Sequence, residues 1–423
     1  MRKHILVLNC GSSSVKFNLF VLEDKQMLQA TLQGIAEEIG NPGKSRIRYG
    51  WGGDKKTAQV ALPDHRSALT QVFSLLETQG IDQSSIVAVG HRVVHGGDRY
   101  SNSVRVDTAV LETIRQLIPI APLHNPPNLT GLEESIRLLP EVPQVAVFDT
   151  AFHETMPEYA YRYAIPDLWY KTYGVRKYGF HGTSHMYVAR RAARKLGIPF
   201  TQFNGITAHL GNGCSLTKIE GGRSLDTSMG FTPLEGVIMG TRSGDIDPAL
   251  IGHVALQMTR DQHISKEDAF EKVLYDLNKE SGLKAIGKTN MMQDIRTKAL
   301  QGDADCARVI QIYAYRIAKY IGQYWATLPW TDAIVFTAGL GENEAHVRKQ
   351  ILSCLKSLAI EIDDRQNEVR KEEVVIGTSR INPEHPLSVM VIPTDEEIVI
   401  GYDTLYLGYL NKPVPEVYPF ELT

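Results

Sequence analysis

The chain has 423 residues, of which 43% are hydrophobic and 22% are charged, a composition typical of soluble globular proteins. This length exceeds one ordinary hydrophobic core, so two domains are expected. The formal net charge of −3 gives no reason to expect nucleic acid or an anionic membrane surface as a partner.

Neither export nor membrane insertion is indicated. The apolar run ILVL near the N-terminus is far too short for the core of a signal peptide, and no run approaches the roughly 18 apolar residues of a membrane helix. The cysteines are scattered and form no C-x-x-C pair: Cys10, Cys214, Cys306 and Cys354. This pattern argues against a zinc site and favours a reducing compartment, so we expect a cytoplasmic protein.

The first predicted element is a strand that runs into the small polar residues 10–14, CGSSS, after which VKFNLF alternates apolar and polar residues. A Walker P-loop is excluded, because no second glycine precedes Lys16 and a strand period follows instead of a helix. The stretch therefore predicts a hairpin whose backbone N–H groups and hydroxyls could approach an anion. An ordinary hairpin is the alternative.

Strands and helices then alternate along the chain, which indicates an α/β class. Asp107 is expected to cap one helix and Ser184 another that ends at Gly197, and residues 305–328 show a long helical period. The polar stretches 40–54 and 363–386 are predicted to be peripheral loops or hairpins.

Residues 205–224 repeat the architecture of residues 5–20, with an apolar strand, the turn GNG and an alternating strand. Two such hairpins could clamp a polyphosphate from both sides, with the cleft between two domains. A third segment, residues 333–343, predicts a buried strand, the glycine-rich turn AGLGEN and the start of a helix, an arrangement compatible with a nucleotide.

Several side chains of this sequence suit chemistry on anions. Arg92 and Arg242 lie among small residues that would let a ligand approach, and Asp149 follows the apolar run VAVF, where it would project at the carboxyl edge of a sheet. Histidines recur beside turns, and a structural role is the alternative for any one of them: His124, His181 and His209.

The ordered motifs LNCGSSSVKF, GHRVVHGG, APLHNPPNL, VFDTAFHETMP, YGFHGTSH, HLGNGCS, DTSMGFTPLEGVIMGTRSGDIDP, FTAGLGEN and IPTDEE cover essentially the whole chain. Together they resemble the acetate/propionate/butyrate kinase family of the actin, sugar kinase and Hsp70-type ATPase superfamily. The resemblance implies two similar ribonuclease H-like α/β domains around a nucleotide cleft. Residues 1–151 plus 394–423 would form the N-terminal domain and residues 152–393 the C-terminal domain.

The resemblance also implies a set of site residues. The residues expected to act on the transferred group are Asp149, His181 and Arg242. Those expected to hold the carboxylate substrate are Arg92, Val94, Leu123, Phe180 and Pro233. Those expected to hold the nucleotide are Ser12, Ser14, Lys16, His209, Leu210, Gly211, Asn212, Gly213, Asp294, Ile295, Arg296, Gly339, Leu340, Gly341, Glu342 and Asn343. Asn9 and Glu396 would hold Mg²⁺, with Mn²⁺ as an alternative metal.

The implied reaction is direct in-line transfer of a phosphoryl group from ATP to acetate, giving ADP and acetyl phosphate, and its reverse. Two anions must be brought together, so cations are needed: Mg²⁺, Arg92, Arg242 and, as a further candidate, His181 as an imidazolium. Acetate is already ionised at neutral pH and needs no general base. Asp149, to which the family assigns an acid/base role, is therefore interpreted mainly as an orienting residue.

Two departures from the family pattern stand out. Residues 281–296 are about two residues longer than the pattern, which weakens the adenosine assignment of Asp294 and Arg296, and Cys214 replaces a smaller residue. Cys10 and Cys214 each adjoin a proposed phosphate loop. Buried fillers are the alternative, but we expect reactive thiols whose modification inactivates the enzyme and is slowed by MgATP, whereas Cys306 and Cys354 should not matter.

Two other functions stay open. The first is a kinase for propionate or another short carboxylate, although Val94 in place of a smaller residue favours acetate. The second is an actin- or Hsp70-like ATPase regulated by a protein partner. The resemblance also suggests a homodimer.

Overall fold

The computed structural model describes residues 2–41, 43–51, 54–122 and 124–422. The chain divides into two compact units, which are Met1–Glu154 with Asp395–Thr423 (unit 1) and Thr155–Thr394 (unit 2). The predicted domain boundaries, after residue 151 and before residue 394, remain predictions.

Unit 1 is built on an eight-stranded sheet in the order β5-β4-β3-β2-β1-β6-β8-β7. The strands are β1 His4–Cys10, β2 Ser14–Leu22, β3 Leu28–Glu37, β4 Arg46–Trp51, β5 Asp54–Gln59, β6 Ile86–Val93, β7 Val104–Arg105 and β8 Gln144–Phe148. The helices are α1 His65–Thr78, α2 Thr108–Gln116, α3 Asn125–Leu138 and α15 Glu396–Thr404.

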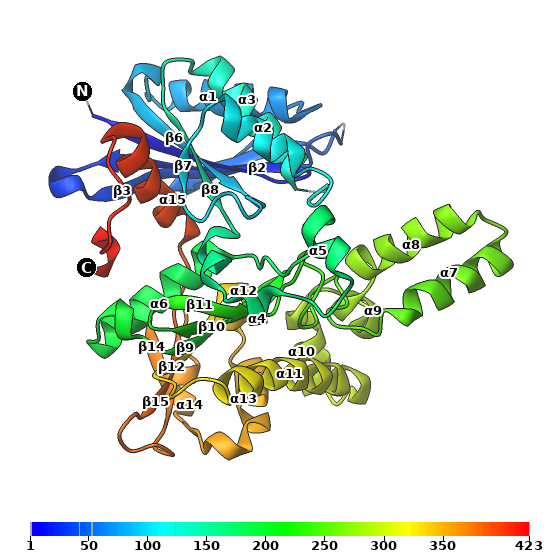
Figure 1. Ribbon diagram of the computed structural model, residues 1–423. Helices are drawn as coiled ribbons and strands as arrows, with labels where there is room; N and C mark the ends of the chain where they lie inside the picture. Colours follow the sequence, from blue (N-terminus) through cyan, green and yellow to red (C-terminus); the bar gives the residue numbers. More distant parts are fainter. Residues whose placement is uncertain (1, 42, 52–53, 123, 423) are drawn as a thin grey trace. The chain divides into compact units, whose positions relative to one another are not determined.

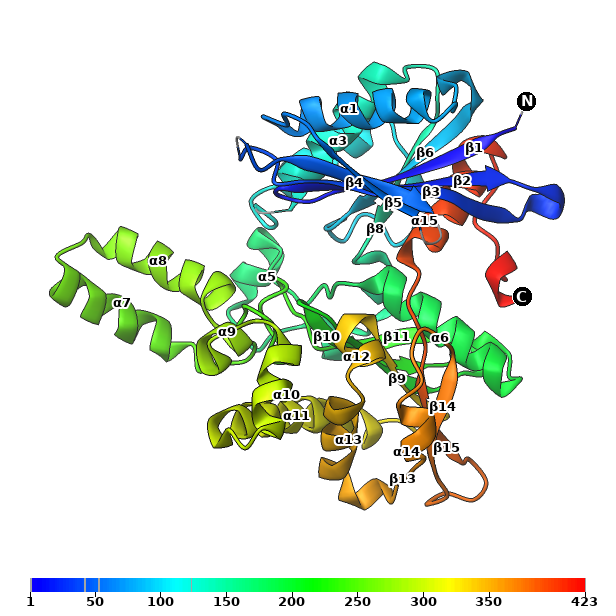
Figure 2. The same cartoon turned by 180° about the vertical axis from the view of Figure 1, so that it is seen from behind.

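Both faces of this sheet are covered near its centre. Helices α1 and α3 pack over one face and α15 over the other (Figures 1 and 2). Because β1 is buried on both sides, its sequence is a continuous apolar run instead of an alternating one. On the α1 side, Leu6, Leu8 and Phe17 pack with Phe73 and Leu76 in one core.

Unit 2 contains a seven-stranded sheet in the order β11-β10-β9-β12-β15-β14-β13. The strands are β9 Gly205–Leu210, β10 Cys214–Glu220, β11 Arg223–Thr227, β12 Ala333–Thr337, β13 Glu361–Ile362, β14 Val374–Ser379 and β15 Leu387–Val391. The helices are α4 Glu158–Tyr161, α5 Asp167–Tyr173, α6 Gly182–Leu196, α7 Ala249–Gln262, α8 Lys266–Lys279, α9 Gly282–Gly287, α10 Met292–Leu300, α11 Ala304–Trp325, α12 Ala338–Asn343, α13 Ala345–Cys354 and α14 Asp364–Asn367.

The two sheets share one topology. In unit 1, β3, β2 and β1 are antiparallel, and β1 then pairs in parallel with β6, which pairs in parallel with β8. In unit 2, β11, β10 and β9 are antiparallel, and β9 pairs in parallel with β12, which pairs in parallel with β15. This repetition confirms the expected fold of two similar α/β units, and both predicted hairpins are present.

The predicted helices are present, but some of them begin at other residues than predicted. Asp107 caps α2 as expected, accepting from the Val110 N–H at 2.8 Å. The Ser184 cap was wrong, because α6 begins at Gly182 and His181 is its N-cap. The predicted turn AGLGEN was also wrong, since these residues form the short helix α12 directly after β12.

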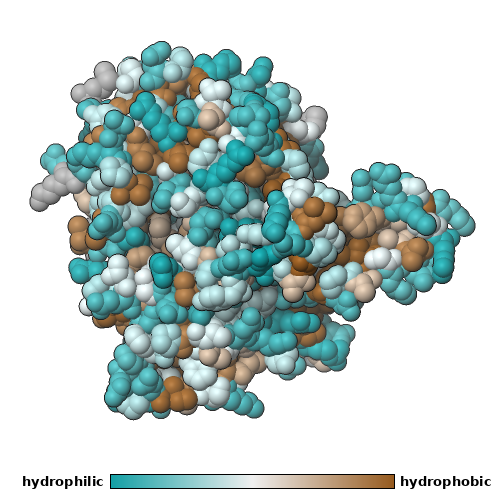
Figure 3. All heavy atoms as spheres, in the orientation of Figure 1, coloured by the Kyte–Doolittle hydropathy of each residue, from teal (hydrophilic) through white to brown (hydrophobic). Residues whose placement is uncertain are grey.

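Helices α7 and α8 pack against each other as an arm that extends away from the sheet of unit 2 (Figures 1 and 2). No side chain of α7 is buried. Figure 3 shows apolar surface along this arm, and Leu256, Phe270 and Tyr275 are 48%, 49% and 58% exposed. Within the described part of the chain, no helix is both long and apolar enough to cross a bilayer.

Candidate active-site groups

The first glycine- and serine-containing turn joins β1 to β2 in unit 1. The Gly11 N–H donates to the Ser14 carbonyl at 2.8 Å and closes the turn. Asn9 is the penultimate residue of β1 and pairs in register with Lys16, whose side chain is exposed. Ser12 is exposed and Ser14 partly so, and both carry their hydroxyls on this turn.

Asn128 on α3 holds this turn, and sequence reasoning did not assign it. Its side-chain amide donates to the Cys10 carbonyl at 2.7 Å, and its oxygen accepts from the Val94 N–H at 3.0 Å. Asn128 is 3% exposed, and its two hydrogen bonds link the first turn to the end of β6. Its only sequence signal was its place in the motif APLHNPPNL.

Arg92 and Asp149 form a bidentate pair within unit 1. Arg92 Nε and Nη2 donate to the two carboxylate oxygens of Asp149 at 2.8 and 2.7 Å, and Arg92 Nη1 lies 3.4 Å from Glu396 Oε2. Burial alone would lower the pKa of Arg92, but the charges of Asp149 and Glu396 raise it above its ordinary value. The guanidinium is therefore permanently charged and held in one orientation.

Carboxylates crowd the start of α15. Burial raises the pKa of Glu396; Arg92 opposes this effect and Asp149 adds to it. Burial likewise raises the pKa of Asp395, the helix N-cap, to about 6. Burial and the charge of Glu396 also raise the pKa of Glu397. These shifts mean that the local negative charge is only partly compensated.

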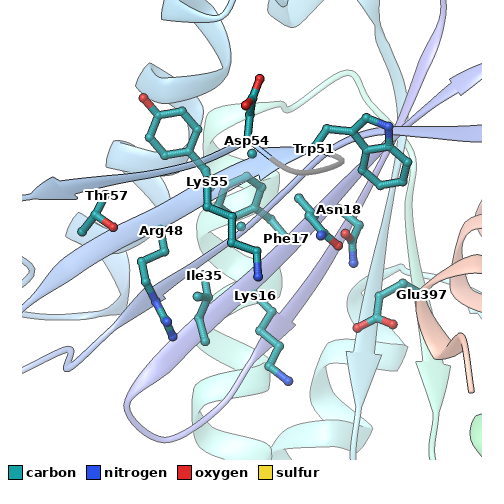
Figure 4. Close-up of a pocket in the computed structure, with 14 residues that line it drawn as sticks. Lys16, Phe17, Asn18, Ile35, Arg48, Trp51, Asp54, Lys55, Thr57 and Glu397 are labelled. Carbon is teal, nitrogen blue, oxygen red and sulfur yellow. The ribbon is translucent and has the colours of Figure 1, made fainter. Parts of the chain in front are cut away.

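Lys16 and Glu397 line one hollow on the exposed part of the sheet of unit 1 (Figure 4). This cavity has a volume of about 300 Å³ and is also lined by Arg48 and Lys55 from β4 and β5. Arg48 is engaged by Glu37 at 2.7 Å.

The donor set of unit 1 fits a hard divalent cation. Asn9 and Glu396 offer amide and carboxylate oxygens, which are the ligands that Mg²⁺ takes. The described residues contain no group of three or more His, Cys, Asp or Glu side chains arranged to hold a metal ion. A Mg²⁺ ion typically keeps several waters and binds substrate phosphates, so one or two protein oxygens suffice.

The second hairpin turn, residues 211–213 between β9 and β10 in unit 2, packs against the segment before Arg242. The Gly240 N–H donates to the Asn212 carbonyl at 2.9 Å. A Cβ atom placed on Gly240 would lie 2.0 Å from Asn212 Oδ1. A Cβ on Gly213 would lie 3.4 Å from both His181 Nε2 and Arg242 Nη1. The glycine turn therefore opens onto His181 and Arg242.

Arg242 has no carboxylate within ion-pair distance among the described residues, and its side-chain hydrogen bonds there go to the Pro233 carbonyl at 3.4 Å and Met239 Sδ at 3.7 Å. Burial lowers the pKa of its guanidinium. A partly buried cation without an anionic partner is costly. Arg242 is thus suited to receive an anion.

The loop that carries Arg242 is held by the start of α9, which the sequence did not reveal. The N–H groups of Leu283 and Lys284 donate to the carbonyls of Met239 and Gly240, each at 2.9 Å. Gly282 makes this approach possible, since a Cβ there would lie 2.2 Å from the Met239 carbonyl oxygen and its φ is +63°.

His181 is placed by an unusual backbone conformation and by side-chain contacts. Its φ is 58°, a left-handed value rare for a residue with a side chain. Its Nδ1 lies 2.9 Å from Ser215 Oγ, and its ring stacks on that of His209 with centroids 4.1 Å apart. His209 Nδ1 in turn lies 2.8 Å from Ser184 Oγ.

The residues predicted to hold adenosine lie on α10 and α12. Ile295 is fully buried, and Arg296 forms an ion pair with Glu344 at 3.1 Å. The Glu342 carboxylate accepts from the backbone N–H groups of Ala338 and Thr394 at 2.8 and 3.1 Å. The side chains of Ile295 and Glu342 thus hold the local fold, which leaves nucleotide contacts to the other residues of these segments.

The predicted residues are divided between the units. Unit 1 contains Asn9, Ser12, Ser14, Lys16, Arg92, Val94, Asp149 and Glu396. Unit 2 contains Phe180, His181, Pro233, Arg242 and the segments 209–213, 294–296 and 339–343. Leu123 lies outside the described residues, and His124 precedes α3.

The expectation that Cys10 and Cys214 have activated thiols was wrong. Both side chains are buried, with Cys10 3% exposed and Cys214 not exposed. Burial raises the pKa of Cys10 to about 12 and that of Cys214 to about 11. Loss of solvation outweighs the backbone dipoles, so both act as small packing residues.

Comparison with known proteins gives consistent matches over nearly the whole chain. The model of the acetokinase family matches residues 4–402. Acetate kinases of Thermotoga maritima and Carboxydothermus hydrogenoformans are 47% and 43% identical to this chain; the alignments cover 95% and 96% of it and 97% and 100% of those proteins.

Solved structures match in the same way. A propionate kinase from Francisella tularensis superposes with a TM-score of 0.86 at 40% identity. An acetate kinase from Porphyromonas gingivalis superposes with a TM-score of 0.85 at 39% identity. Each comparison covers 95% of this chain and 99% of the other.

Proposed function

The chain belongs to the acetokinase family, and on that premise we propose that it transfers a phosphoryl group reversibly from ATP to acetate. The products are ADP and acetyl phosphate. The observation that carries this proposal is Arg242, a partly buried guanidinium without a carboxylate partner among the described residues, next to a glycine turn.

In unit 2, the groups suit a phosphoryl group in transfer. Charge spreads over the equatorial oxygens of that group, and positioned donors stabilise it. Arg242 Nη1 and His181 Nε2 flank the space beside Gly213, so both can donate to the same group. The segment from His209 to Gly213 would accept the nucleotide phosphates, and the segments 294–296 and 339–343 would hold adenosine.

In unit 1, Arg92 would bind the carboxylate of acetate. Asp149 accepts from Nε and Nη2, and Glu396 Oε2 lies 3.4 Å from Nη1, so acetate would share the Nη1 side of the guanidinium with Glu396. Asp149 then acts by fixing Arg92, which supports its interpretation as an orienting residue. No base is required, since a carboxylic acid with a pKa near 4 is already ionised at neutral pH.

Asn9 and Glu396 would hold Mg²⁺, with Mn²⁺ as an alternative. When bound, the ion neutralises charge on the phosphates during transfer. Lys16, Ser12 and Ser14 would approach the same phosphates from the first turn. The raised pKa of Glu396 supports this assignment, because a cation beside the carboxylate would relieve the uncompensated charge.

Acetate is proposed over propionate because Val94 carries a branched side chain where the family leads us to expect a smaller residue in propionate kinases. Phe180, Pro233 and Leu123 are the other proposed neighbours of the methyl group. One methylene changes discrimination by only about 1–3 kcal/mol. Propionate is therefore expected to react, but with lower kcat/KM.

A panel of short carboxylic acids tests the proposal. ADP release is followed with a coupled assay in the presence of Mg²⁺ and ATP, and kcat/KM is compared for acetate, propionate and butyrate. The highest value with acetate supports the proposal. The highest value with propionate would support the rival kinase, and ATP turnover indifferent to all the acids would favour a partner-regulated ATPase.

We also propose that the protein is a cytoplasmic homodimer. The apolar surface of the α7–α8 arm supports association, because it is exposed in the chain as described. Light scattering coupled to gel filtration would give twice the 47.1 kDa mass of the chain. Leu256→Lys should shift the protein toward a monomer if the arm is the interface.

A further inference from the structure

A chain of buried side chains in unit 2 leads from strand β9 to His181. Thr207 Oγ1 lies 2.7 Å from His185 Nδ1, and His185 Nε2 lies 2.7 Å from Ser215 Oγ. The same Ser215 oxygen lies 2.9 Å from His181 Nδ1. Thr207, His185 and Ser215 are fully buried, so water cannot substitute for a missing partner.

The direction of these hydrogen bonds follows from the hydroxyl at the far end. Among the described residues, the one hydrogen-bond partner of the Thr207 hydroxyl is His185 Nδ1. A buried hydroxyl proton without an acceptor is destabilising, because it has lost its hydrogen bond to water. Thr207 therefore donates to His185 Nδ1, which must be unprotonated.

The remaining protons then have only one arrangement. His185, unprotonated at Nδ1, carries its proton on Nε2 and donates it to Ser215 Oγ. The Ser215 hydroxyl accepts from His185, and its own buried proton needs an acceptor; among the described residues its other partner is His181 Nδ1, so it donates there. His181 therefore carries its own proton on Nε2.

We propose that Thr207, His185 and Ser215 are positioning residues that hold His181 as the neutral tautomer protonated at Nε2. That nitrogen is the one near Arg242 Nη1 and Gly213. His181 then serves as a hydrogen-bond donor, since an imidazolium would need a second proton at Nδ1, where Ser215 already donates. The consequence for catalysis rests on the proposed function, whereas the tautomer does not.

Helix α6 and strands β9 and β10 hold these four residues in place. His181 and His185 lie one turn apart at the start of α6, and the His185 N–H donates to the His181 carbonyl at 3.0 Å. Thr207 and Ser215 lie on the neighbouring strands β9 and β10. The four side chains are therefore fixed by a helix and a sheet, not by a loop.

Nitrogen-15 NMR of the protein labelled in histidine tests the tautomer directly, because protonated and unprotonated ring nitrogens differ strongly in chemical shift. The spectrum is recorded at mildly alkaline pH, and the His181 signals are identified by their loss in His181→Gln. We expect Nε2 protonated and Nδ1 unprotonated in the unaltered protein. Protonation at Nδ1, or at both nitrogens, would overturn the proposal without any need for a variant.

Variants of Thr207 test the origin of the tautomer. Thr207→Val keeps the shape but removes the donor, so nothing then fixes the His185 proton on Nε2, and part of the His181 population should shift to protonation at Nδ1. Thr207→Ser keeps the donor and should leave the His181 shifts unchanged. Unchanged shifts in a folded Thr207→Val would show that Thr207 does not set the tautomer.

Kinetics link the tautomer to the proposed reaction. In Thr207→Val, kcat should fall, by up to the roughly 10²- to 10³-fold cost of losing one donor to the transition state, while the KM for acetate changes little. Thr207→Ser should retain kcat. The expected NMR pattern in a protein that does not phosphorylate acetate would sustain the tautomer and reject the proposed function.

Discussion

Filling the space beside Gly213 is the sharpest test of the anion site in unit 2. In Gly213→Ala, the new methyl carbon would lie 3.3 Å from His181 Cε1 and 3.4 Å from both His181 Nε2 and Arg242 Nη1. Gly213 does not have a positive φ, so the backbone accepts alanine. The substitution should therefore block the site while leaving the fold intact.

The expected loss follows from the two donors that the methyl group would cover. Hydrogen bonds to charged groups contribute about 1.5–3 kcal/mol each, so losing both costs about 3–6 kcal/mol. This corresponds to a decrease in kcat/KM of roughly 10²- to 10⁴-fold.

The assay measures ADP release with saturating acetate over a range of MgATP concentrations, and thermal unfolding is recorded in parallel. Gly322→Ala is a matched control, because Gly322 lies on α11 and a Cβ there would have no atom within 4 Å. The control should retain kcat/KM. A folded Gly213→Ala enzyme with kcat/KM within about threefold of the unaltered protein would refute the role of this space.

Three further predictions concern stability, reactivity and specificity. Burial lowers the pKa of His91 from 6.5 to about 4, so the unfolded chain binds the extra proton first and about 3 kcal/mol of stability is lost as pH falls from 6.5 toward 4. In denaturant unfolding, the free energy of unfolding of His91→Gln should fall less steeply between pH 6.5 and 4 than that of the unaltered protein. Equal slopes for the two proteins would contradict the lowered pKa of His91. A thiol reagent should label the exposed Cys354 first without loss of activity; early loss that tracks Cys10 or Cys214 in mass spectrometry would contradict their burial. Val94→Ala should raise kcat/KM for propionate relative to acetate by about 10-fold or more, whereas an unchanged ratio would assign the size limit to another residue.

The sequence alone determined the class of fold and the local elements. Strand periods on either side of small-residue turns predicted both hairpins, because alternation and glycine are local signals. The strand before Asp149 and the helix cap at Asp107 could be predicted for the same reason. The ordered motifs also identified the family, which the comparisons confirmed.

The tertiary structure alone decided how these elements act on one another. Asn128 and Gly282 gain their roles from contacts with Cys10 and Met239, which lie far away in the sequence. Burial reversed the expected reactivity of Cys10, since exposure of a thiol depends on what packs over it and not on the turn beside it. The proton on His181 is likewise set by Thr207, through contacts between a helix and two strands that no sequence period encodes.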